Sequence, residues 1–270
     1  MSNHSHTVSI VGAGWLGLPL AIRLNSFFTT LVSCSTEKKV SALKKQGLNA
    51  RCMTVSESGN ISANFDSDAF FLSDIVIITL PFRRYFSDPR CYEYQMEAIL
   101  SRISLTSKIV FTSSTSVYPD DSGYISESDH FYPKTLRQFT LKAVEEKVIS
   151  REGIVLRLAG LYGPNREIGR FFSHRKLHRH PDSPVNLIHL DDVIGIIVGL
   201  IQKNLSSSIY NLVSDFHPTR QELYSYYAKK YGGCAPEFSL SAPIGNKIIS
   251  NTRIKDMLGY MFIYPNPMED

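Results

Sequence analysis

Hydrophobic residues gather along this chain in short runs that are rich in β-branched side chains. The runs lie at residues 7–11, 31–34, 74–80, 108–112, 155–158 and 209–213. Most are separated by segments long enough for a helix, and this alternation predicts a parallel, doubly wound sheet. Four of the runs show little alternation with polar residues, which is typical of strands covered on both faces. The pattern therefore predicts an α/β protein.

Helical spacing of apolar residues marks several segments between and after these runs. Residues 16–24 and 136–149 carry apolar side chains at three- and four-residue intervals, which predicts helices that cover the sheet. Residues 193–201 are apolar nearly all round, which predicts a buried helix. Residues 219–231 predict a further helix before a Gly-Gly break and a proline-punctuated tail. We expect this last part of the chain to form a small accessory lobe.

Three glycines follow the first strand in the run Gly-Ala-Gly-Trp-Leu-Gly. Gly12 would let the chain turn sharply, Gly14 would remove the side chain that faces a pyrophosphate, and Gly17 would let the next helix approach the sheet. Trp15 and Leu16 complete the turn. Free N–H groups at the helix N-terminus favour anions. The segment therefore predicts the phosphate-binding turn of a dinucleotide fold.

The turn and the alternating pattern together predict a Rossmann-type doubly wound parallel sheet with a small C-terminal substrate lobe. We assign residues 1–162 and 186–214 to the dinucleotide-binding domain. Residues 163–185 and 215–270 would form the lobe that shapes the substrate pocket.

The end of the second strand indicates which dinucleotide would bind. About 20 residues after the glycine turn, NAD-binding proteins usually carry an acidic residue for the ribose 2′-hydroxyl. Ser35 and Thr36 stand there instead, followed by Lys38, and these groups can donate to a 2′-phosphate that a carboxylate would repel. The sequence therefore favours NADP. A one-residue shift would make Glu37 the ribose ligand, so NAD stays an alternative.

Two further positions are candidates for the cofactor site. Leu80 and Pro81 close the fourth strand at its carboxyl end, where open α/β sheets bind ligands. We expect them to flank the adenosine ribose.

Composition narrows the function classes without naming one. The 270 residues carry a net charge of +4 that forms no block of like charges, and no nucleic-acid-binding motif occurs. The longest apolar run has nine residues, too few to span a bilayer. No secretory leader pattern precedes the first strand. We therefore expect a cytoplasmic protein with a small-molecule substrate and no nucleic-acid or membrane partner.

Neither cysteine nor histidine spacing predicts a metal site. Cys34, Cys52, Cys91 and Cys234 are far apart and form no CxxC pair. The histidines at 174, 178 and 180 are irregularly spaced and have no carboxylate partner in a metal motif. Arg166 and Arg170, in the same generally basic region, are candidates for contact with an anionic substrate.

A series of landmarks resembles the extended short-chain dehydrogenase/reductase family, in its atypical NAD-dependent epimerase/dehydratase-like branch. After the glycine turn, the predicted strand within residues 108–118 ends in Ser-Ser-Thr-Ser-Val-Tyr, and Glu127 follows it. Residues 157–164 then read Arg-Leu-Ala-Gly-Leu-Tyr-Gly-Pro, residues 186–193 read Asn-Leu-Ile-His-Leu-Asp-Asp-Val, and residues 210–212 read Tyr-Asn-Leu. We expect His189 to be structural and Asp191 and Asp192 to cap the following helix. The resemblance covers most of the chain and implies an NAD(P)-dependent oxidoreductase or epimerase. It is also consistent with a homodimer.

The same resemblance implies roles for two strand-end serines. Ser114 matches the hydroxyl that hydrogen-bonds the reacting oxygen, and Ser113 would lie beside the cofactor.

The tyrosine of the family's Tyr-x-x-x-Lys pair is missing. Aligning Glu145 with the family's helix glutamate places Arg137 and Leu141 at the two catalytic positions, whereas aligning Lys142 as the lysine places Gln138 at the tyrosine. Arg137 would polarise a carbonyl or bind a carboxylate, because its pKa is too high for a general base. Lys142 would hold the nicotinamide ribose.

The proton source therefore stays open between Tyr118, Tyr124, Tyr132 and a bound water. Two functions follow as hypotheses: an oxidoreductase or epimerase/dehydratase-like enzyme for a small polar substrate such as a nucleotide sugar, or an inactive NADP(H)-binding sensor or scaffold.

Overall fold

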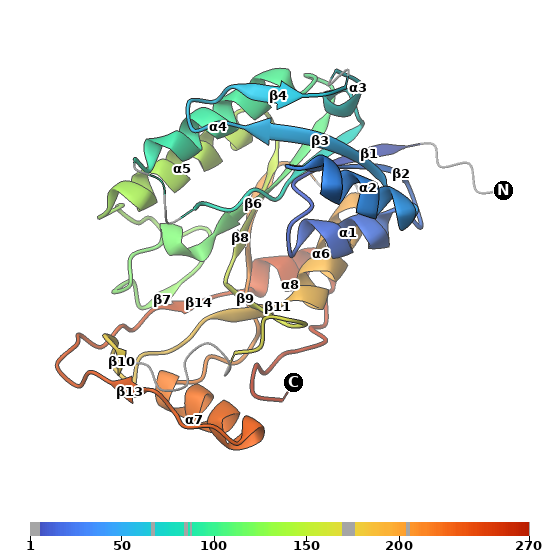
Figure 1. The fold of residues 1–270 in the computed structure, drawn as a ribbon. Coiled ribbons are helices and arrows are strands. Elements are labelled where there is room, and N and C mark those ends of the chain that lie inside the picture. Colours follow the sequence, from blue (N-terminus) through green and yellow to red (C-terminus); the bar gives the residue numbers. More distant parts are fainter. Residues whose placement is uncertain are drawn as a thin grey trace. The chain divides into compact units, whose positions relative to one another are not determined.

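The fold is described from a computed structural model, shown in Figure 1. Described residues are 6–65, 68–83, 86, 88–168, 176–203 and 206–269. Arg170, His174 and Arg175 lie outside these ranges, as does part of the predicted 163–185 segment.

Eight strands form the central sheet in the order β12-β8-β6-β5-β1-β2-β3-β4. They are β1 (Thr7–Val11), β2 (Thr29–Cys34), β3 (Asn49–Val55), β4 (Ile61–Ala63), β5 (Ile75–Ile78), β6 (Lys108–Ser114), β8 (Ile154–Leu158) and β12 (Ser208–Leu212). The pairs β1/β2, β1/β5, β2/β3 and β5/β6 are parallel, and β4 is antiparallel to β3. The predicted doubly wound sheet is therefore confirmed, with one antiparallel edge strand in addition.

The helices are α1 (Gly17–Leu24), α2 (Glu37–Lys45), α3 (Asp68–Phe71), α4 (Arg90–Arg102), α5 (Leu136–Ile149), α6 (Leu190–Gln202), α7 (Arg220–Tyr231) and α8 (Thr252–Leu258), with a 3-10 turn η1 at Thr115–Val117. Helix α6 is largely buried, as its sequence predicts. Within the described ranges, no helix is long and apolar enough to cross a membrane.

Short strand pairs complete the fold outside the central sheet. They are β7 (Tyr124–Ile125) with β14 (Ile248–Ile249), β9 (Gly160–Tyr162) with β11 (Leu187–His189), and β10 (Lys176–Leu177) with β13 (Glu237–Phe238).

The strands that sequence patterning predicts are the buried ones. Every residue of β8 is buried, and β1, β5 and β6 are buried except at their ends. The prediction missed β3 and β4, where exposed and buried residues mix. Because β4, at the edge, and β3, next to it, are only partly covered, they lack the continuous apolar run by which the central strands are recognised.

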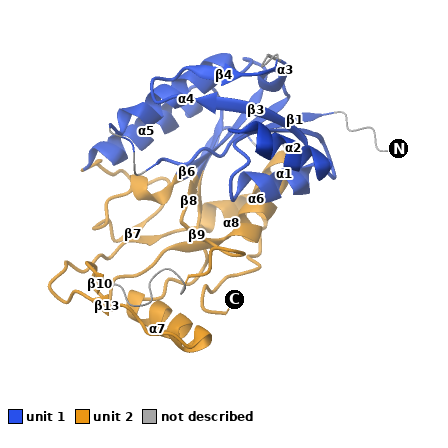
Figure 2. Cartoon of the chain, viewed as in Figure 1, with its two compact units in different colours: residues 1–113, 135–156, 205–209 blue, residues 114–134, 157–204, 210–270 orange. Residues whose placement is uncertain are grey.

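The chain divides into two compact units, coloured separately in Figure 2. Unit 1 comprises residues 1–113, 135–156 and 205–209, and unit 2 comprises 114–134, 157–204 and 210–270. These boundaries differ from those of the predicted domains, because unit 2 already begins at Ser114, the last residue of β6, and again at Arg157, within β8. The predicted domain assignment stays a prediction.

The prediction for the start of α6 was wrong in its details. The cap is His189, whose Nδ1 accepts a hydrogen bond from the backbone N–H of Asp191 (3.2 Å). Asp192 is buried and its carboxylate accepts from Tyr260 Oη and from the N–H groups of Ile263 and Tyr264. Asp192 therefore fixes the C-terminal segment, a long-range role that local spacing does not reveal.

Candidate functional site

The glycine turn of unit 1 is held by polar side chains from two neighbouring strands. Gly12 has φ +103°, and its N–H donates to Ser33 Oγ (3.0 Å). Thr79 Oγ1 donates to the Gly12 carbonyl (2.8 Å), while Ala13 N–H donates to the Ser33 carbonyl (2.6 Å). β2 and β5 thus fix the path of the turn from both sides.

The other two glycines of the turn differ in what surrounds them. A Cβ on Gly17 would lie 1.9 Å from the Gly12 carbonyl oxygen and 2.7 Å from Thr79 Oγ1. A Cβ on Gly14 would meet no atom within 4 Å, and the φ of Gly14 is not in the left-handed region. Packing therefore requires glycine at position 17. At position 14 the absence of a side chain leaves open space, which is what close approach by a dinucleotide phosphate requires.

Helix α1 begins at this turn without a side-chain cap. Its N-cap residue is Leu16, whereas Thr36, Thr135 and Thr219 cap α2, α5 and α7 through their hydroxyls. The first N–H groups of a helix have no partner within it, and the helix dipole favours negative charge there. An uncapped helix start beside Gly14 suits a pyrophosphate, so these residues fit a dinucleotide.

The segment after β2 is arranged so that hydroxyls and one cation are exposed. Ser35 and Lys38 are exposed, and Thr36 Oγ1 accepts from Lys39 N–H (3.3 Å) while keeping its own proton. Glu37 accepts a hydrogen bond from Asn64 Nδ2. Lys39 is bonded through its ammonium to the Ala13 carbonyl of the turn. Lys39 therefore supports the turn, whereas the neighbouring residues Ser35, Thr36 and Lys38 are exposed to solvent.

Leu80 and Pro81 lie just past the end of β5, in the same unit as the turn. The Leu80 carbonyl accepts from Tyr92 Oη (2.9 Å), and Pro81 is exposed. Leu80 Cδ2 would lie 3.2 Å from a Cβ on Gly12. The structure thus brings this strand end to the glycine turn.

Ser113, at the end of β6, is bonded to helix α5. Its hydroxyl donates to Glu145 Oε1 (2.5 Å), and both residues are buried. Arg137, Leu141 and Glu145 are spaced by four residues and so share one face of α5, on which Leu141 is buried as well. Gln138, which takes the tyrosine position in the other alignment, is buried as well, so both alignments stay predictions.

In the alternative alignment Gln138 and Lys142 stand at the two catalytic positions, and each side chain has a partner close by in the sequence. Gln138 forms a capping box with Thr135, and Lys142 lies 3.9 Å from Glu146 on the same helix. Arg137 stacks its guanidinium 4.5 Å from the centroid of the Phe82 ring. In neither alignment does α5 supply a phenol.

Ser114 belongs to unit 2, although it follows Ser113 directly. Its Oγ accepts from Ser116 N–H (3.2 Å) and Ser116 Oγ (2.9 Å), and so caps η1. The hydroxyl keeps a proton that it can donate.

Four residues of the family resemblance meet in one buried network of unit 2. Tyr118 Oη donates to Asn211 Oδ1 (3.0 Å) and accepts from Arg157 Nη1 (2.6 Å). Asn211 N–H donates to Glu127 Oε1 (2.6 Å). Burial raises the pKa of Tyr118, and burial also raises the pKa of Glu127. Because Tyr118 is fully buried and its proton is held inside the protein, this phenol is poorly placed to donate to a substrate.

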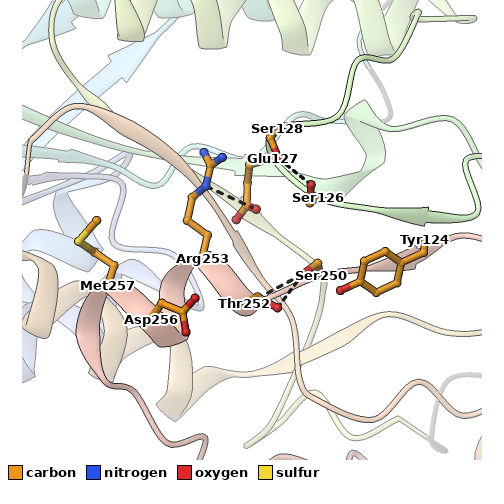
Figure 3. Close-up of a pocket in the computed structure, with 9 residues that line it drawn as sticks. All are labelled: Tyr124, Ser126, Glu127, Ser128, Ser250, Thr252, Arg253, Asp256 and Met257. Atoms are coloured by element: carbon orange, nitrogen blue, oxygen red, sulfur yellow. Dashed lines mark hydrogen bonds and ion pairs between the residues drawn. The ribbon is translucent and has the colours of Figure 1, made fainter.

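A pocket of about 630 Å³ opens beside this network (Figure 3). Its lining residues are Tyr124, Ser126, Glu127, Ser128, Ser250, Thr252, Arg253, Asp256 and Met257. Arg253 Nε lies 3.9 Å from the Glu127 carboxylate. Tyr124 is largely exposed, as is Tyr132, so both phenols are accessible to solvent.

The sequence-predicted residues thus separate into two sets. The glycine turn, Ser35, Thr36, Lys38, Leu80, Pro81, Ser113, Arg137 and Lys142 belong to unit 1, and Ser114 to unit 2. Sequence reasoning missed Ser33, a polar residue buried inside a strand, and the supporting role of Lys39. The feature of the sequence that could have indicated Ser33 is a serine inside an otherwise apolar strand. In the described part of the chain, no three His, Cys, Asp or Glu side chains cluster as metal ligands would.

Comparison with known proteins places the chain in a family. No protein-family model matches it. It is 37% identical over 273 residues to protein YeeZ of Escherichia coli (strain K12), with 97% of each chain covered. Its fold is similar to that of UDP-glucuronic acid 4-epimerase from Bacillus cereus in complex with NAD, with TM-score 0.75 at 16% identity and coverage of 97% and 94%. The fold of dTDP-glucose 4,6-dehydratase from Bacillus anthracis in complex with NAD is also similar, with TM-score 0.76 at 12% identity and coverage of 98% and 94%. The chain therefore belongs to the family of protein YeeZ, and the solved structures of similar fold confirm the predicted Rossmann-type architecture.

Proposed function

We propose that the protein binds NADP(H) in unit 1 and is an oxidoreductase or epimerase/dehydratase-like enzyme for a small polar substrate. The observation that carries the proposal is the space at Gly14. Backbone conformation explains glycine at position 12, where φ is +103°, and packing explains it at position 17, where a Cβ would overlap the Gly12 carbonyl. The protein itself gives no steric reason for glycine at position 14, whereas a bound pyrophosphate does.

The preference for NADP over NAD rests on the groups after β2. Ser35 and Lys38 are exposed, and Glu37 is engaged by Asn64. A 2′-phosphate would gain charge-assisted hydrogen bonds there. The two solved structures of similar fold are complexes with NAD, so they support a nicotinamide dinucleotide without favouring NADP.

The nicotinamide would supply hydride chemistry at its C4 atom. Of the chain's own residues, Ser114 would orient the reacting oxygen through its free proton. Arg137 would polarise a carbonyl or hold a carboxylate, since a guanidinium does not act as a general base near neutral pH. Tyr124, Tyr132 or a bound water would transfer the proton. By analogy with the sugar-nucleotide enzymes of similar fold, a nucleotide sugar is one substrate of this kind.

The direct test is titration of NADPH and NADH fluorescence against wild type and Gly14→Val. We expect wild type to bind NADPH and G14V to bind it at least tenfold more weakly. Because nothing lies within 4 Å of the added Cβ, G14V should change the free energy of unfolding by less than about 0.5 kcal/mol.

Gly17→Ala is the matched contrast within the same turn. Its methyl group would overlap the Gly12 carbonyl, so we expect a loss of more than about 3 kcal/mol in urea unfolding. Wild type that binds neither nucleotide, or G14V that binds as tightly as wild type, would refute the proposed function.

A second function, a non-catalytic NADP(H) sensor or scaffold, is favoured by the missing phenol on α5. The two differ in turnover: an enzyme consumes bound NADPH when carbonyl compounds and nucleotide sugars are added, and a sensor does not. Ser114→Ala should lower turnover at least tenfold while leaving NADPH binding unchanged. Intact turnover in S114A would remove the role given to this serine.

A further inference from the structure

Three cationic side chains of unit 2 gather around one carboxylate. Lys247 Nζ lies 2.9 Å from Asp120 Oδ1, and Arg179 Nη1 lies 3.2 Å from Asp120 Oδ2. Arg220, the first residue of α7, is close enough to Arg179 and Asp120 for their charges to act on its pKa. The cluster therefore has three positive charges against one negative charge.

Hydrogen bonds between backbone segments hold these side chains together. Arg220 N–H donates to the Ser183 carbonyl (3.0 Å), and Gly245 N–H donates to Ser183 Oγ (2.9 Å). Lys247 donates in addition to the Tyr118 carbonyl (3.1 Å), and its side chain is only 14% exposed. The arrangement is thus built from four separate chain segments, in contrast to a run of solvated lysines on one helix.

Arg220 carries the strongest indication of a missing partner. Its Nε is buried and has no hydrogen-bond partner among the residues that the structure describes. Within the same residues, no carboxylate lies at ion-pair distance from its guanidinium; its hydrogen-bond partner is the neutral phenol of Tyr224. Burial lowers the pKa of Arg220. A buried charge is costly unless an opposite charge compensates it, and Asp120 is already paired with two other cations.

We propose that Arg220, Lys247 and Arg179 form a binding site for the oxyanion group, phosphate or carboxylate, of a small-molecule ligand. The guanidinium of Arg220 would donate in parallel to two ligand oxygens, and Lys247 would add a point charge. Asp120 would keep Lys247 and Arg179 in position without neutralising the cluster. This site goes beyond the proposed function and does not depend on dinucleotide binding by unit 1.

The test is calorimetric titration with inorganic phosphate and, separately, with malonate at constant ionic strength. Wild type and Gly14→Val are both titrated, because phosphate that binds at the glycine turn of wild type should not bind G14V. We expect at least one anion to bind equally to both proteins. Arg220→Gln should weaken that binding at least tenfold, because it removes the guanidinium that donates to two ligand oxygens in parallel.

Lys229→Gln is the matched control, since Lys229 is an exposed cation on the same helix α7. We expect K229Q to bind as wild type does, and Arg220→Lys, which keeps the charge without the fork, to bind with intermediate affinity. If circular dichroism shows that R220Q does not fold, Lys247→Gln is the second variant, and we expect it to lose anion binding as well.

Two results would overturn the site: neither anion binds wild type at millimolar concentration, or K229Q loses as much affinity as R220Q and K247Q. NADPH titration of R220Q separates the two proposals. If R220Q binds NADPH as wild type does but no longer binds the anion, both proposals are supported. If wild type itself binds no NADPH, only the proposed function is refuted.

Discussion

Individual side chains after β2 govern the expected choice between NADP and NAD. Ser35 and Lys38 face solvent, and the only carboxylate nearby in the sequence, Glu37, accepts a hydrogen bond from Asn64. The sequence alone left Glu37 as a competing ribose ligand. The contact with Asn64 comes from a residue 27 positions away, so local spacing does not reveal it.

Ser35→Asp is expected to reverse the dinucleotide preference. A carboxylate there would repel the 2′-phosphate of NADPH and accept from the 2′-hydroxyl of NADH. NADPH affinity should fall at least tenfold while NADH affinity stays the same or rises, measured by fluorescence titration. Ser26→Asp, at an exposed position outside the site, controls for added negative charge. Equal affinities of S35D and wild type for NADPH would mean that the 2′-phosphate lies elsewhere.

Arg137 shows what residue-level reasoning from the sequence achieved and where it stopped. Two alignments of α5 were open, with Arg137 or Gln138 at the tyrosine position. In the structure Leu141 and Glu145, which share a face with Arg137, are buried, but Gln138 is buried as well, so both alignments stay predictions. Helical periodicity gives the spacing, but which face turns inward depends on the strand against which the helix packs.

Strands β1 and β5 are joined at their amino ends by one carboxylate. Asp74 Oδ2 accepts from Thr7 N–H (2.7 Å) and Thr7 Oγ1 (2.8 Å). These hydrogen bonds, the backbone one first, lower the pKa of Asp74. The carboxylate therefore helps fix the register of two central strands, although it is partly exposed.

Asp74→Asn should destabilise the protein modestly and in a pH-dependent way. Because the folded pKa of Asp74 is lowered, its contribution is complete above its ordinary value of about 4 and is lost as pH falls through the lowered value. At pH 7 we expect a loss of about 0.5–1 kcal/mol in urea unfolding, allowing for solvent screening.

The difference between wild type and D74N should shrink on acidification towards pH 3. A difference that stays constant from pH 7 to pH 3 would show that the ionised carboxylate is not its source. Asp256→Asn is the control, because in the described part of the chain no backbone N–H is found to donate to the Asp256 carboxylate.

At the scale of the whole molecule, the residues that carry the family resemblance lie mainly in unit 2. Tyr118, Glu127, Arg157 and Asn211 come from distant parts of the sequence and form one buried hydrogen-bond network. The sequence left Tyr118 among the candidate proton donors, beside Tyr124, Tyr132 and a bound water. Its burial instead gives it a structural role, which ties the strand-end loop after β6 to β8 and β12.

The basic cluster at Arg220 is likewise a product of the folded chain. Asp120, Arg179 and Lys247 are separated by more than 50 residues each, and no spacing rule connects them. Sequence analysis recognised a generally basic region around residue 179 but had no means of selecting its partners.

The sequence by itself determined the alternation of buried strands and helices, the glycine turn and the family. These depend on local chemistry: apolar runs, periodicity and residues without side chains. Only the tertiary structure decided that Gly17 is required by packing while Gly14 is not, that Ser113 is bonded to Glu145, and that Tyr118 is enclosed. Such properties depend on neighbours brought from far along the chain, and the periodicity of a segment contains no information about those neighbours.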